Sequence, residues 1–523
     1  MNAFAADKSY AIWGHDGGAI AFTNPLANDH SHMTRVWRIE ETGTVGTVQI
    51  SVSLNNLRGT APLLIRSTDA TIDAADEQIP LTQSGNFLVA TIDFNDGDHF
   101  TFAQEPPPAP GGISHELGVW LRADREVYAD LGTTNAVNNN PVQQWNTQLG
   151  TDHTTQTSAN QQPIFKDGNQ TEAINFNPGV FFDGSNDELH FPSRLGVTGT
   201  NNFTIFAAGK LSSTGLKRIF GPASSASNAY EMDVNRASAV QAGVVVAASG
   251  PKTTVVNESF IAFTSRNGNT FSAGTNGEIP ATGTNTKNFT SSNNYDLGSS
   301  YNQNPDFHGT LGEFVVYQGA KTSDDIQKIQ TYLALKYGAT LDTNYVASSG
   351  TTIWTKDSVY NQAIAGIGFD KAAGLLQKQS WSTVDTTIAI GLGNIFQSNP
   401  LNSSTFPNNL SFLIWGSDGA TNTVDISINP LLTRMQRVWK VANIQSIGNV
   451  VARVYGPALG VTDETPVVIV SSDEIFDETD TIYEMSENGD YFKGTINLPD
   501  GAYFTIGLKA PQPLIIPIKY SKN

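Results

Sequence analysis

Two acidic segments carry the most regular set of candidate metal ligands in the sequence. Three aspartates of the first segment recur in the second with the same spacing: Asp69, Asp73 and Asp76, then Asp473, Asp477 and Asp480. Calcium takes about six to eight oxygen ligands at roughly 2.4 Å, and closely spaced loop carboxylates without competing lysines supply them. The sequence therefore predicts calcium as the only cofactor, with a solvated acidic loop as the alternative interpretation.

A third acidic segment, Asp183-Gly184-Ser185-Asn186-Asp187, offers carboxylate and amide oxygens in a similar way. Asp183, Asn186 and Asp187 are candidate ion ligands here. Asx-type turns use the same residues, because their short polar side chains accept hydrogen bonds from the backbone two residues on. We expect such a turn before a strand, with an ion site as the alternative.

Three aromatic residues lie among polar neighbours and are candidates for contact with sugars: Trp145, Tyr295 and Tyr301. Sugar rings stack on exposed aromatic faces, and neighbouring Asn, Asp and Gln side chains bind their hydroxyls. The sequence predicts a polysaccharide or cell-surface glycan as the ligand. Trp145 also has an alternative interpretation as a core residue.

The composition excludes several classes of function. The 523 residues include 30 Lys and Arg against 49 Asp and Glu, and a net charge of -19 repels a phosphate backbone, so nucleic acid is not expected as a partner. With no cysteine, neither a disulfide nor a thiolate metal site is available. We find no nucleophile elbow, phosphate loop or zinc-protease motif, and no apolar run of about 20 residues for membrane insertion.

An internal repeat determines the organisation of the two ends. Three stretches of the first hundred residues recur about 400 residues later: Ile12–Gly17 at Ile414–Gly419, Met33–Trp37 at Met435–Trp439, and Asp96–Phe102 at Asp500–Ile506. Val48, Ile50 and Val52 alternate with polar residues, as in a strand with one buried face. The repeat predicts two homologous β-sandwich domains, and we expect the tryptophans they share, at positions 13, 37, 415 and 439, to pack in their cores.

The segments between the copies complete a multidomain, all-β prediction. Residues 106–112 form a proline-rich linker, and the short apolar runs of 113–342 are separated by polar turns, as in a central β-sandwich. One short helix is expected near 322–337, since Thr322 and Asp325 have capping-box spacing and Gly338 follows as a stop. A β-domain at 343–510 contains the second copy (411–508), and 511–523 is a tail.

The first 105 residues match only the later part of that domain. They have no counterpart of 345–410, so either they are a partial copy or 345–410 belongs with the central sandwich. We favour the partial copy. The sequence starts without a secretion signal, so we interpret it as an excised piece of a larger protein that repeats a unit of about 400 residues.

Three stretches of the middle segment resemble one family: Gly118–Asp124 with Val142–Trp145, Val180–Asp187, and Leu297-Gly298 with Phe307–Tyr317. In order and spacing they are similar to the laminin-G-like, concanavalin A-like jelly roll (lectin/glucanase superfamily) of large bacterial extracellular or surface proteins. The resemblance implies a jelly roll at 113–342. The segment 343–510 is similar to an uncharacterised β-domain that follows such jelly rolls.

The resemblance also implies a test for catalysis, because related jelly rolls include glycoside hydrolases with a Glu-x-Asp-x-Glu or Glu-x-Asp-x-x-Glu strand. Glu231-Met232-Asp233 matches in part, but Asn235 and Arg236 stand where the third carboxylate belongs. We therefore predict a non-catalytic extracellular region for adhesion or carbohydrate binding, with neighbouring repeats as further partners. The alternatives are a purely structural stalk and a polysaccharide-degrading glycoside hydrolase.

Overall fold

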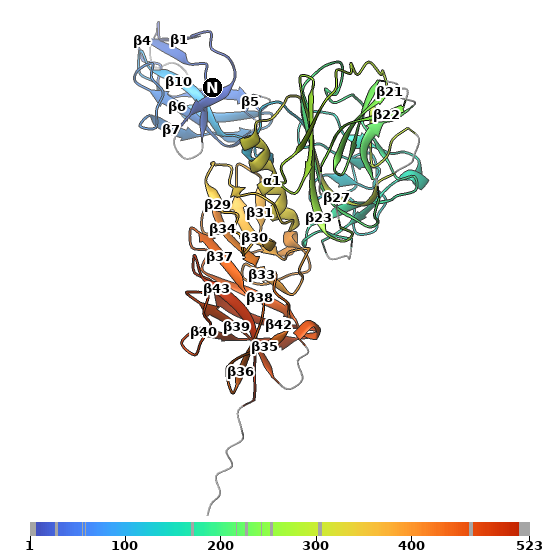
Figure 1. Cartoon of the computed structure of the whole chain (residues 1–523). Coiled ribbons are helices and arrows are strands. Elements are labelled where there is room, and N and C mark those ends of the chain that lie inside the picture. Colours follow the sequence, from blue (N-terminus) through green and yellow to red (C-terminus); the bar gives the residue numbers. More distant parts are fainter. Residues whose placement is uncertain are drawn as a thin grey trace, which may run out of the picture. The chain divides into compact units, whose positions relative to one another are not determined.

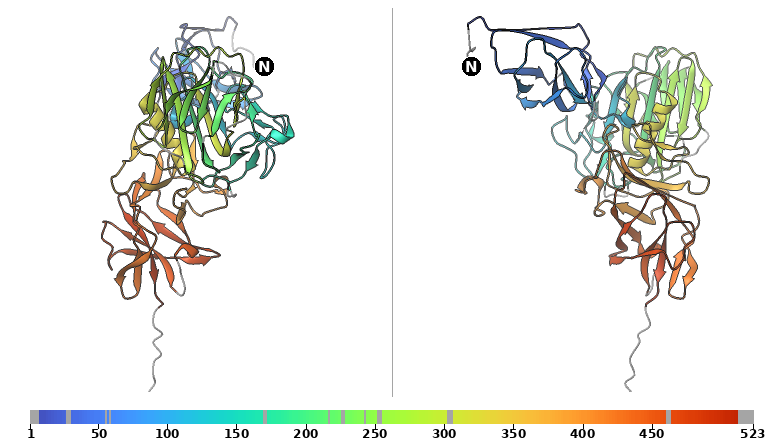
Figure 2. Two further views of the ribbon diagram at one scale, coloured as in Figure 1. Left: turned by 45° about the vertical axis from the view of Figure 1, so that its right-hand side comes forward. Right: turned by 90° about the vertical axis from the view of Figure 1, so that its left-hand side faces the viewer.

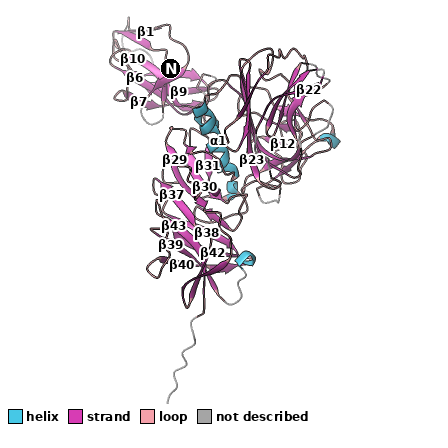
Figure 3. Cartoon of the chain, in the orientation of Figure 1, coloured by secondary structure: helices cyan, strands magenta, loops and turns pink. Residues whose placement is uncertain are grey.

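The computed structural model describes residues 7–511 except 27–29, 55, 58, 169–171, 216, 225–227, 242, 251–254, 302–305 and 460–463. In these residues the protein consists of strands with one α-helix, α1 (Ser323–Tyr337), which Figure 3 shows in cyan among magenta strands. The chain divides into two compact units, Met1–Pro108 and Ala109–Asn523. The predicted all-β, multidomain fold is confirmed.

The first unit is a sandwich of two antiparallel sheets around one apolar core. The larger sheet has the order β1-β4-β10-β3-β2, with β6 beside β10 and β7 beside β6; the smaller sheet has the order β5-β9-β8. Leu64 on β6, Leu88 on β9 and Phe100 on β10 meet in the core. The strands are β1 (Tyr10–His15), β2 (Phe22–Pro25), β3 (Ser31–Met33), β4 (Trp37–Thr42), β5 (Val48–Ser53), β6 (Thr60–Ser67), β7 (Glu77–Pro80), β8 (Thr82–Ser84), β9 (Phe87–Ile92) and β10 (His99–Glu105).

The C-terminal domain, coloured orange to red in Figures 1 and 2, contains a counterpart of each strand of this sandwich and adds further strands. Its larger sheet has the order β31-β30-β34-β37-β43-β36-β35 with β39 and β40 added, and its smaller sheet has the order β32-β33-β38-β42-β41. The strands are β30 (Gln362–Asp370), β31 (Leu375–Gln377), β32 (Gln379–Ser380), β33 (Ile388–Gly391), β34 (Ser411–Ser417), β35 (Val424–Asn429), β36 (Leu432–Met435), β37 (Trp439–Ile444), β38 (Asn449–Tyr455), β39 (Thr465–Ser471), β40 (Thr481–Glu484), β41 (Ser486–Asn488), β42 (Tyr491–Asn497) and β43 (Tyr503–Lys509).

Details of packing are alike in the two copies. Trp37 stacks on Phe100 with ring centroids 5.5 Å apart, and Trp439 stacks on Phe504 at 5.2 Å. The C-terminal domain has four strands without a counterpart in the described part of the first unit, namely β30 to β33. These strands come from residues 345–410, which therefore complete the C-terminal sandwich.

The central sandwich is built from β11 to β27 in two large sheets, which Figure 1 shows in cyan to green. The eight-stranded sheet comprises β11 (Leu117–Arg122), β15 (Ile164–Lys166), β16 (Gly179–Asp183), β18 (Phe203–Leu211), β23 (Ser259–Asn267), β24 (Thr270–Thr275), β25 (Ala281–Thr284) and β27 (His308–Tyr317). The nine-stranded sheet comprises β12 (Val127–Tyr128), β13 (Gln144–Trp145), β14 (Thr154–Thr155), β17 (Leu189–His190), β19 (Arg218–Pro222), β20 (Ala229–Asp233), β21 (Arg236–Gln241), β22 (Gly243–Ser249) and β26 (Tyr295–Leu297). Aromatic side chains such as Phe182, Phe220 and Phe314 fill the space between the sheets.

The helix α1 begins at the predicted capping box, in which the Thr322 hydroxyl accepts from the Asp325 backbone, and it ends at Gly338 in a left-handed conformation. Its apolar side packs against the outer side of the eight-stranded sheet, and Leu333 shares one core cluster with Phe206 and Ile414. Two short strands, β28 (Tyr345–Val346) and β29 (Thr352–Trp354), follow it. The helix therefore covers one outer face of the central sandwich.

Candidate functional site

The nine-stranded sheet of the central sandwich carries charged side chains on its outer face. Successive residues of a strand point to opposite faces. Because Tyr230 and Met232 of β20 lie in the core between the sheets, Glu231 and Asp233 face outward. The same alternation turns His190 of β17 and Asp296 of β26 outward, since their neighbours Leu189, Tyr295 and Leu297 are core residues. We call these outward side chains, together with Glu188, Arg218 and Asp306, the polar row.

One half of the polar row is an arginine-centred ion-pair cluster. Arg218 forms an ion pair with Glu231 and donates from Nε to Asp233 Oδ1 at 2.9 Å. Arg236 contacts the other oxygen of Asp233 at 2.6 Å, and Ser300 Oγ donates to Glu231 Oε1 at 2.8 Å. Burial raises the pKa of Glu231, and Arg218 opposes that rise. Both carboxylates of the partial catalytic pattern are therefore held by guanidinium groups.

The other half of the polar row is centred on His190. His190 and Asp296 are direct partners in the β17–β26 ladder, and His190 Nδ1 lies 2.6 Å from Asp296 Oδ1. His190 Nε2 lies 3.8 Å from Glu188 Oε1. The histidine side chain is 44% exposed, whereas that of Asp296 is 2% exposed. The bond to Asp296 raises the pKa of His190, so a fixed imidazole with a stabilised charge is accessible on this face.

Two further carboxyl groups of the row have pKa values displaced toward neutrality. Burial raises the pKa of Asp306 to about 6, although its bond from Ser299 Oγ at 3.2 Å opposes the rise. Burial and the charge of Asp296 raise the pKa of Glu188. With a pKa of about 6, the Asp306 carboxyl is protonated part of the time near neutral pH and can then both donate and accept hydrogen bonds.

The structure corrects two of the three aromatic candidates for sugar stacking. Trp145 and Tyr295 are buried, with exposed fractions of 0% and 1%. Trp145 Nε1 donates to the Arg122 carbonyl at 2.9 Å, and Tyr295 stacks on Phe220 at a centroid distance of 4.4 Å. Both rings are covered by the core. Tyr301 is 38% exposed and directly follows Ser300, the donor to Glu231, so it is an accessible aromatic residue beside the polar row.

The repeated acidic segments form the same Asx turns in both copies. Asp69 Oδ1 accepts from the Thr71 backbone at 2.7 Å, and Asp473 Oδ1 accepts from the Ile475 backbone at 2.8 Å. The second and third aspartates interlock, because Asp76 and Asp480 accept from the backbone of Asp73 and Asp477. Among the described residues no group of three or more His, Cys, Asp or Glu side chains is placed to hold a metal ion. Calcium binding by these segments stays a prediction.

The segment Asp183–Asp187 folds into the expected turn. Asp183 Oδ1 accepts from the Ser185 backbone at 2.8 Å, and Asp187 Oδ2 accepts from the Asp183 backbone at 2.8 Å. Asn186 donates from its side chain to the Asn160 carbonyl at 2.9 Å. Burial raises the pKa of Asp187 to about 6. These bonds describe the turn, and an ion at this position stays a prediction as well.

Sequence reasoning missed His190 and Asp296, which are 106 residues apart. Their only local signal is a single polar residue between apolar neighbours on a strand of two or three residues, which is too short for alternation to be recognised. The strand pairing that joins them depends on the topology of the whole sheet.

Two family models match the chain. A model described as a domain of unknown function (DUF8202) matches residues 1–98 and 325–502, which together make up more than half of the chain. The chain belongs to the DUF8202 family. A second model, described as the concanavalin A-like lectin/glucanases superfamily, matches residues 183–327. The central sandwich of this DUF8202 chain is therefore a concanavalin A-like jelly roll, as its resemblance predicted.

Solved structures resemble the DUF8202 chain only distantly. Domain 4 of AbnA, a GH43 extracellular arabinanase from Geobacillus stearothermophilus in complex with arabinotriose, is 14% identical, with a TM-score of 0.30 over 42% of this chain and 100% of that one. Trypanosoma rangeli sialidase is 12% identical, with a TM-score of 0.29 over 58% of this chain and 53% of the sialidase. Likenesses at this level carry no argument about activity. No curated protein matches the chain, and its described residues include no helix long and apolar enough to cross a membrane.

Proposed function

We propose that the jelly roll binds a polysaccharide or cell-surface glycan on the outer face of its nine-stranded sheet and does not cleave it. The observation that carries the proposal is the half-exposed His190 ring, fixed by Asp296 within a row of hydrogen-bonding side chains. Glycan sites combine convergent polar groups with an accessible aromatic face, and Tyr301 offers such a face beside the row. The parent protein is an extracellular bacterial adhesin or secreted protein.

The state of Glu231 and Asp233 supports binding without hydrolysis. A retaining glycosidase needs one carboxylate as nucleophile and a second carboxyl group as acid, about 5 Å apart. Here Arg218 pairs with both groups, and Arg236 occupies the sequence position at which the third acid of the pattern is missing. Both carboxylates are therefore engaged in ion pairs with guanidinium groups, which leaves neither as a free nucleophile or acid.

A glycan array tests the proposal on the full chain. We expect wild-type protein to give signals on a limited set of glycans and the variants Tyr301→Ala and His190→Ala to lose them. Tyr455→Ala is the matched control, because Tyr455 is 39% exposed and lies on β38 of the C-terminal domain. An array without any wild-type signal would favour the purely structural stalk instead, and unchanged binding by both variants would place the site elsewhere.

Hydrolysis is the second candidate function, favoured by one observation. Burial raises the pKa of Asp306 to about 6, and a carboxyl group with a raised pKa is the usual general acid of a glycosidase. The test is release of reducing ends from a polysaccharide panel by wild-type protein and by Asp306→Asn. Release that disappears in Asp306→Asn while glycan binding persists would establish the enzyme.

A further inference from the structure

The larger sheet of the first unit ends in an edge strand, β1. The counterpart of this strand in the C-terminal domain is paired with a neighbouring strand on both edges. In the C-terminal domain, β34 pairs with β37 on one edge and with β30 on the other. In the first unit, β1 is the counterpart of β34 and pairs with β4; no second neighbour of β1 is found among the described residues. Unpaired edge strands attract other strands, because their backbone groups are ready to form a ladder.

The apolar side chains of β1 are exposed on both faces of the sheet, contrary to the prediction that Trp13 packs in a core. Trp13 is 61% exposed and Ile12 is 66% exposed, whereas Trp415 and Ile414 at the same positions are 1% and 0% exposed. Residues of β30 and β33 bury Trp415 inside the C-terminal sandwich. Its core cluster there includes Ala365, Ile367, Ile388 and Ile390. The first unit therefore has an open position in its core.

The backbone of β1 is oriented to receive a strand in the register that β30 uses. The backbone N–H of Asp16 donates to Val36 on the β4 side at 3.1 Å, as Asp418 donates to Val438 in the second copy at 3.0 Å. Since successive residues of a strand direct their backbone groups to opposite edges, Trp13 and Ala11 face the open edge. Their counterparts Trp415 and Leu413 lie opposite Ala365 and Ile367 of β30.

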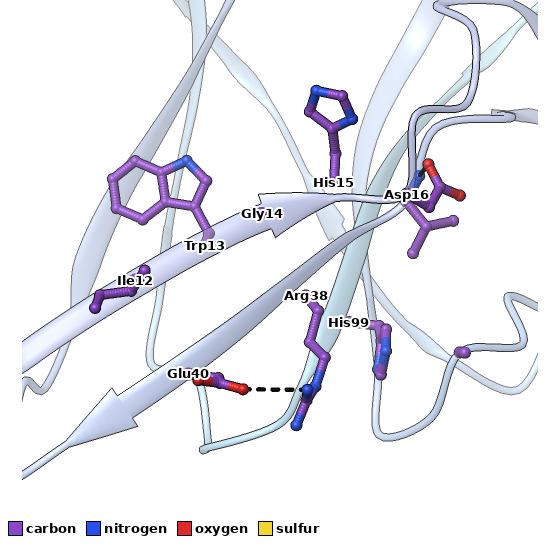
Figure 4. A pocket seen from close by; sticks show the side chains of 10 residues that line it. Ile12, Trp13, Gly14, His15, Asp16, Arg38, Glu40 and His99 are labelled. Carbon is purple, nitrogen blue, oxygen red and sulfur yellow. Dashed lines mark hydrogen bonds and ion pairs between the residues drawn. The ribbon is translucent and has the colours of Figure 1, made fainter.

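A groove on the outer face of the same sheet corresponds to a position that Trp354 occupies in the second copy. A Cβ atom added to Gly416 would lie 2.8 Å from the Trp354 ring, whereas one added to the matching Gly14 would meet no atom within 4 Å. Above Gly14 the first unit has a groove of about 510 Å³, lined among others by Ile12, Trp13 and Arg38 (Figure 4).

The charged residues of the two copies indicate that the same covering segment is missing from the first unit. In the C-terminal domain, Lys440 forms an ion pair of 3.0 Å with Asp357, which lies between β29 and β30. Arg38 is the counterpart of Lys440 and is 57% exposed, with a contact of 3.1 Å to Glu40, which is 63% exposed (Figure 4). The groove thus offers a cation where the second copy binds an aspartate of the covering segment.

We propose that the first unit is a docking site for a polypeptide segment with the chemistry of residues 352–370. The incoming segment adds a strand to β1 in antiparallel register, covers Gly14 with an aromatic side chain and pairs a carboxylate with Arg38. Neighbouring DUF8202 repeats are the source of such a segment, since this chain itself carries one in its second copy. The docking joins successive repeats by completing a sandwich, and it is independent of glycan binding by the jelly roll.

A labelled peptide of residues 352–370 tests the proposal with the full chain as receptor. We expect saturable binding of one peptide per chain by fluorescence anisotropy, and exchange of the Ala11 and Trp13 amide hydrogens slowed by about 100-fold, as for paired strands. A peptide with Trp354→Ala should bind about tenfold more weakly. The chain variant Arg38→Asp should weaken binding about fivefold, and the peptide variant Asp357→Arg should restore it.

A fusion removes the dependence on peptide solubility. Residues 343–391 joined ahead of Met1 by a flexible linker should slow amide exchange in residues 10–15, whereas the same fusion with Ile367→Asp should not. Unchanged exchange in both the peptide and the fusion experiments would overturn the proposal. Glycan-array signals that depend on Trp13 would overturn it too, because they would assign the groove to a sugar.

Discussion

Lys336 Nζ lies 2.6 Å from Glu313 Oε1, in a fully buried contact between α1 and the eight-stranded sheet of the jelly roll. Tyr332 donates to the same oxygen at 2.6 Å, and Trp120 Nε1 donates to Oε2 at 2.8 Å. Each polar atom of this carboxylate is thus satisfied, which is the condition under which a buried charge is tolerated. The contact fixes α1 on the sheet and leaves the nine-stranded sheet as the face available for a ligand.

Removing the ammonium group of this pair should destabilise the second unit strongly. Lys336→Met leaves the Glu313 carboxylate buried without its counter-charge, at a cost of about 3–5 kcal/mol in the free energy of unfolding. Urea denaturation followed by circular dichroism measures the change. The matched control is Lys356→Met, whose exposed pair with Asp342 contributes at most about 1 kcal/mol. Equal losses in the two variants would contradict the assigned role of Glu313.

Alanine substitutions of Trp145 and Tyr301 should have different effects on the free energy of unfolding. Trp145→Ala empties a core position and should lower the free energy of unfolding by about 3–5 kcal/mol. Tyr301→Ala changes an exposed side chain and should lower it by no more than about 0.5 kcal/mol. Thermal unfolding of the two variants at one pH provides the comparison. A large loss in Tyr301→Ala would mean that its ring serves packing instead of a ligand.

The His190–Asp296 bond makes a pH-dependent contribution to stability. Because the bond raises the pKa of His190 above its ordinary value of 6.5, protonated histidine is favoured in the folded state. This stabilisation is complete below about pH 6.5 and is lost as the pH rises through the folded-state pKa. Melting temperatures from about pH 5 to about pH 9 should fall more steeply for wild type than for His190→Gln. Parallel curves would show that the charged pair does not form.

Calcium binding by the acidic segments can be tested at the second copy. Asp477 already accepts bonds from the Thr479 backbone and hydroxyl, which lower its pKa and keep it ionised. Calorimetric titration with calcium should give a binding heat in wild type that disappears in Asp473→Ala and Asp477→Ala. The absence of heat in wild type would leave these aspartates with the turn-forming role that their bonds already describe.

The sequence predicted the features that depend on local pattern. Strand alternation and the Thr322 capping box were sufficient for an all-β, multidomain fold with a central sandwich and one helix, and the structure confirms these. The repeat predicted the flanking sandwiches, whose strand orders match. Exposure was harder to predict. Trp13 and Trp415 have nearly identical neighbours in sequence, and only the presence or absence of β30 and β33 decides which of them is buried.

The candidate site residues were also hard to predict from the sequence. Trp145 has glutamine and asparagine neighbours, as an exposed aromatic residue does, yet its ring points between the sheets. His190 and Asp296 carry no motif and become a pair because β17 and β26 are adjacent in the nine-stranded sheet. Such sites follow from non-local strand pairing, which a single sequence specifies only through the fold as a whole.

Affinity electrophoresis of the full chain in polysaccharide gels, combined with a reducing-end assay on the same polysaccharides, tests the central claim most directly. We predict that at least one polysaccharide retards wild-type protein, that no reducing ends appear, and that His190→Ala and Tyr301→Ala migrate as they do without polysaccharide. Release of reducing ends, or equal retardation of wild type and both variants, would contradict a non-catalytic glycan site on the polar row.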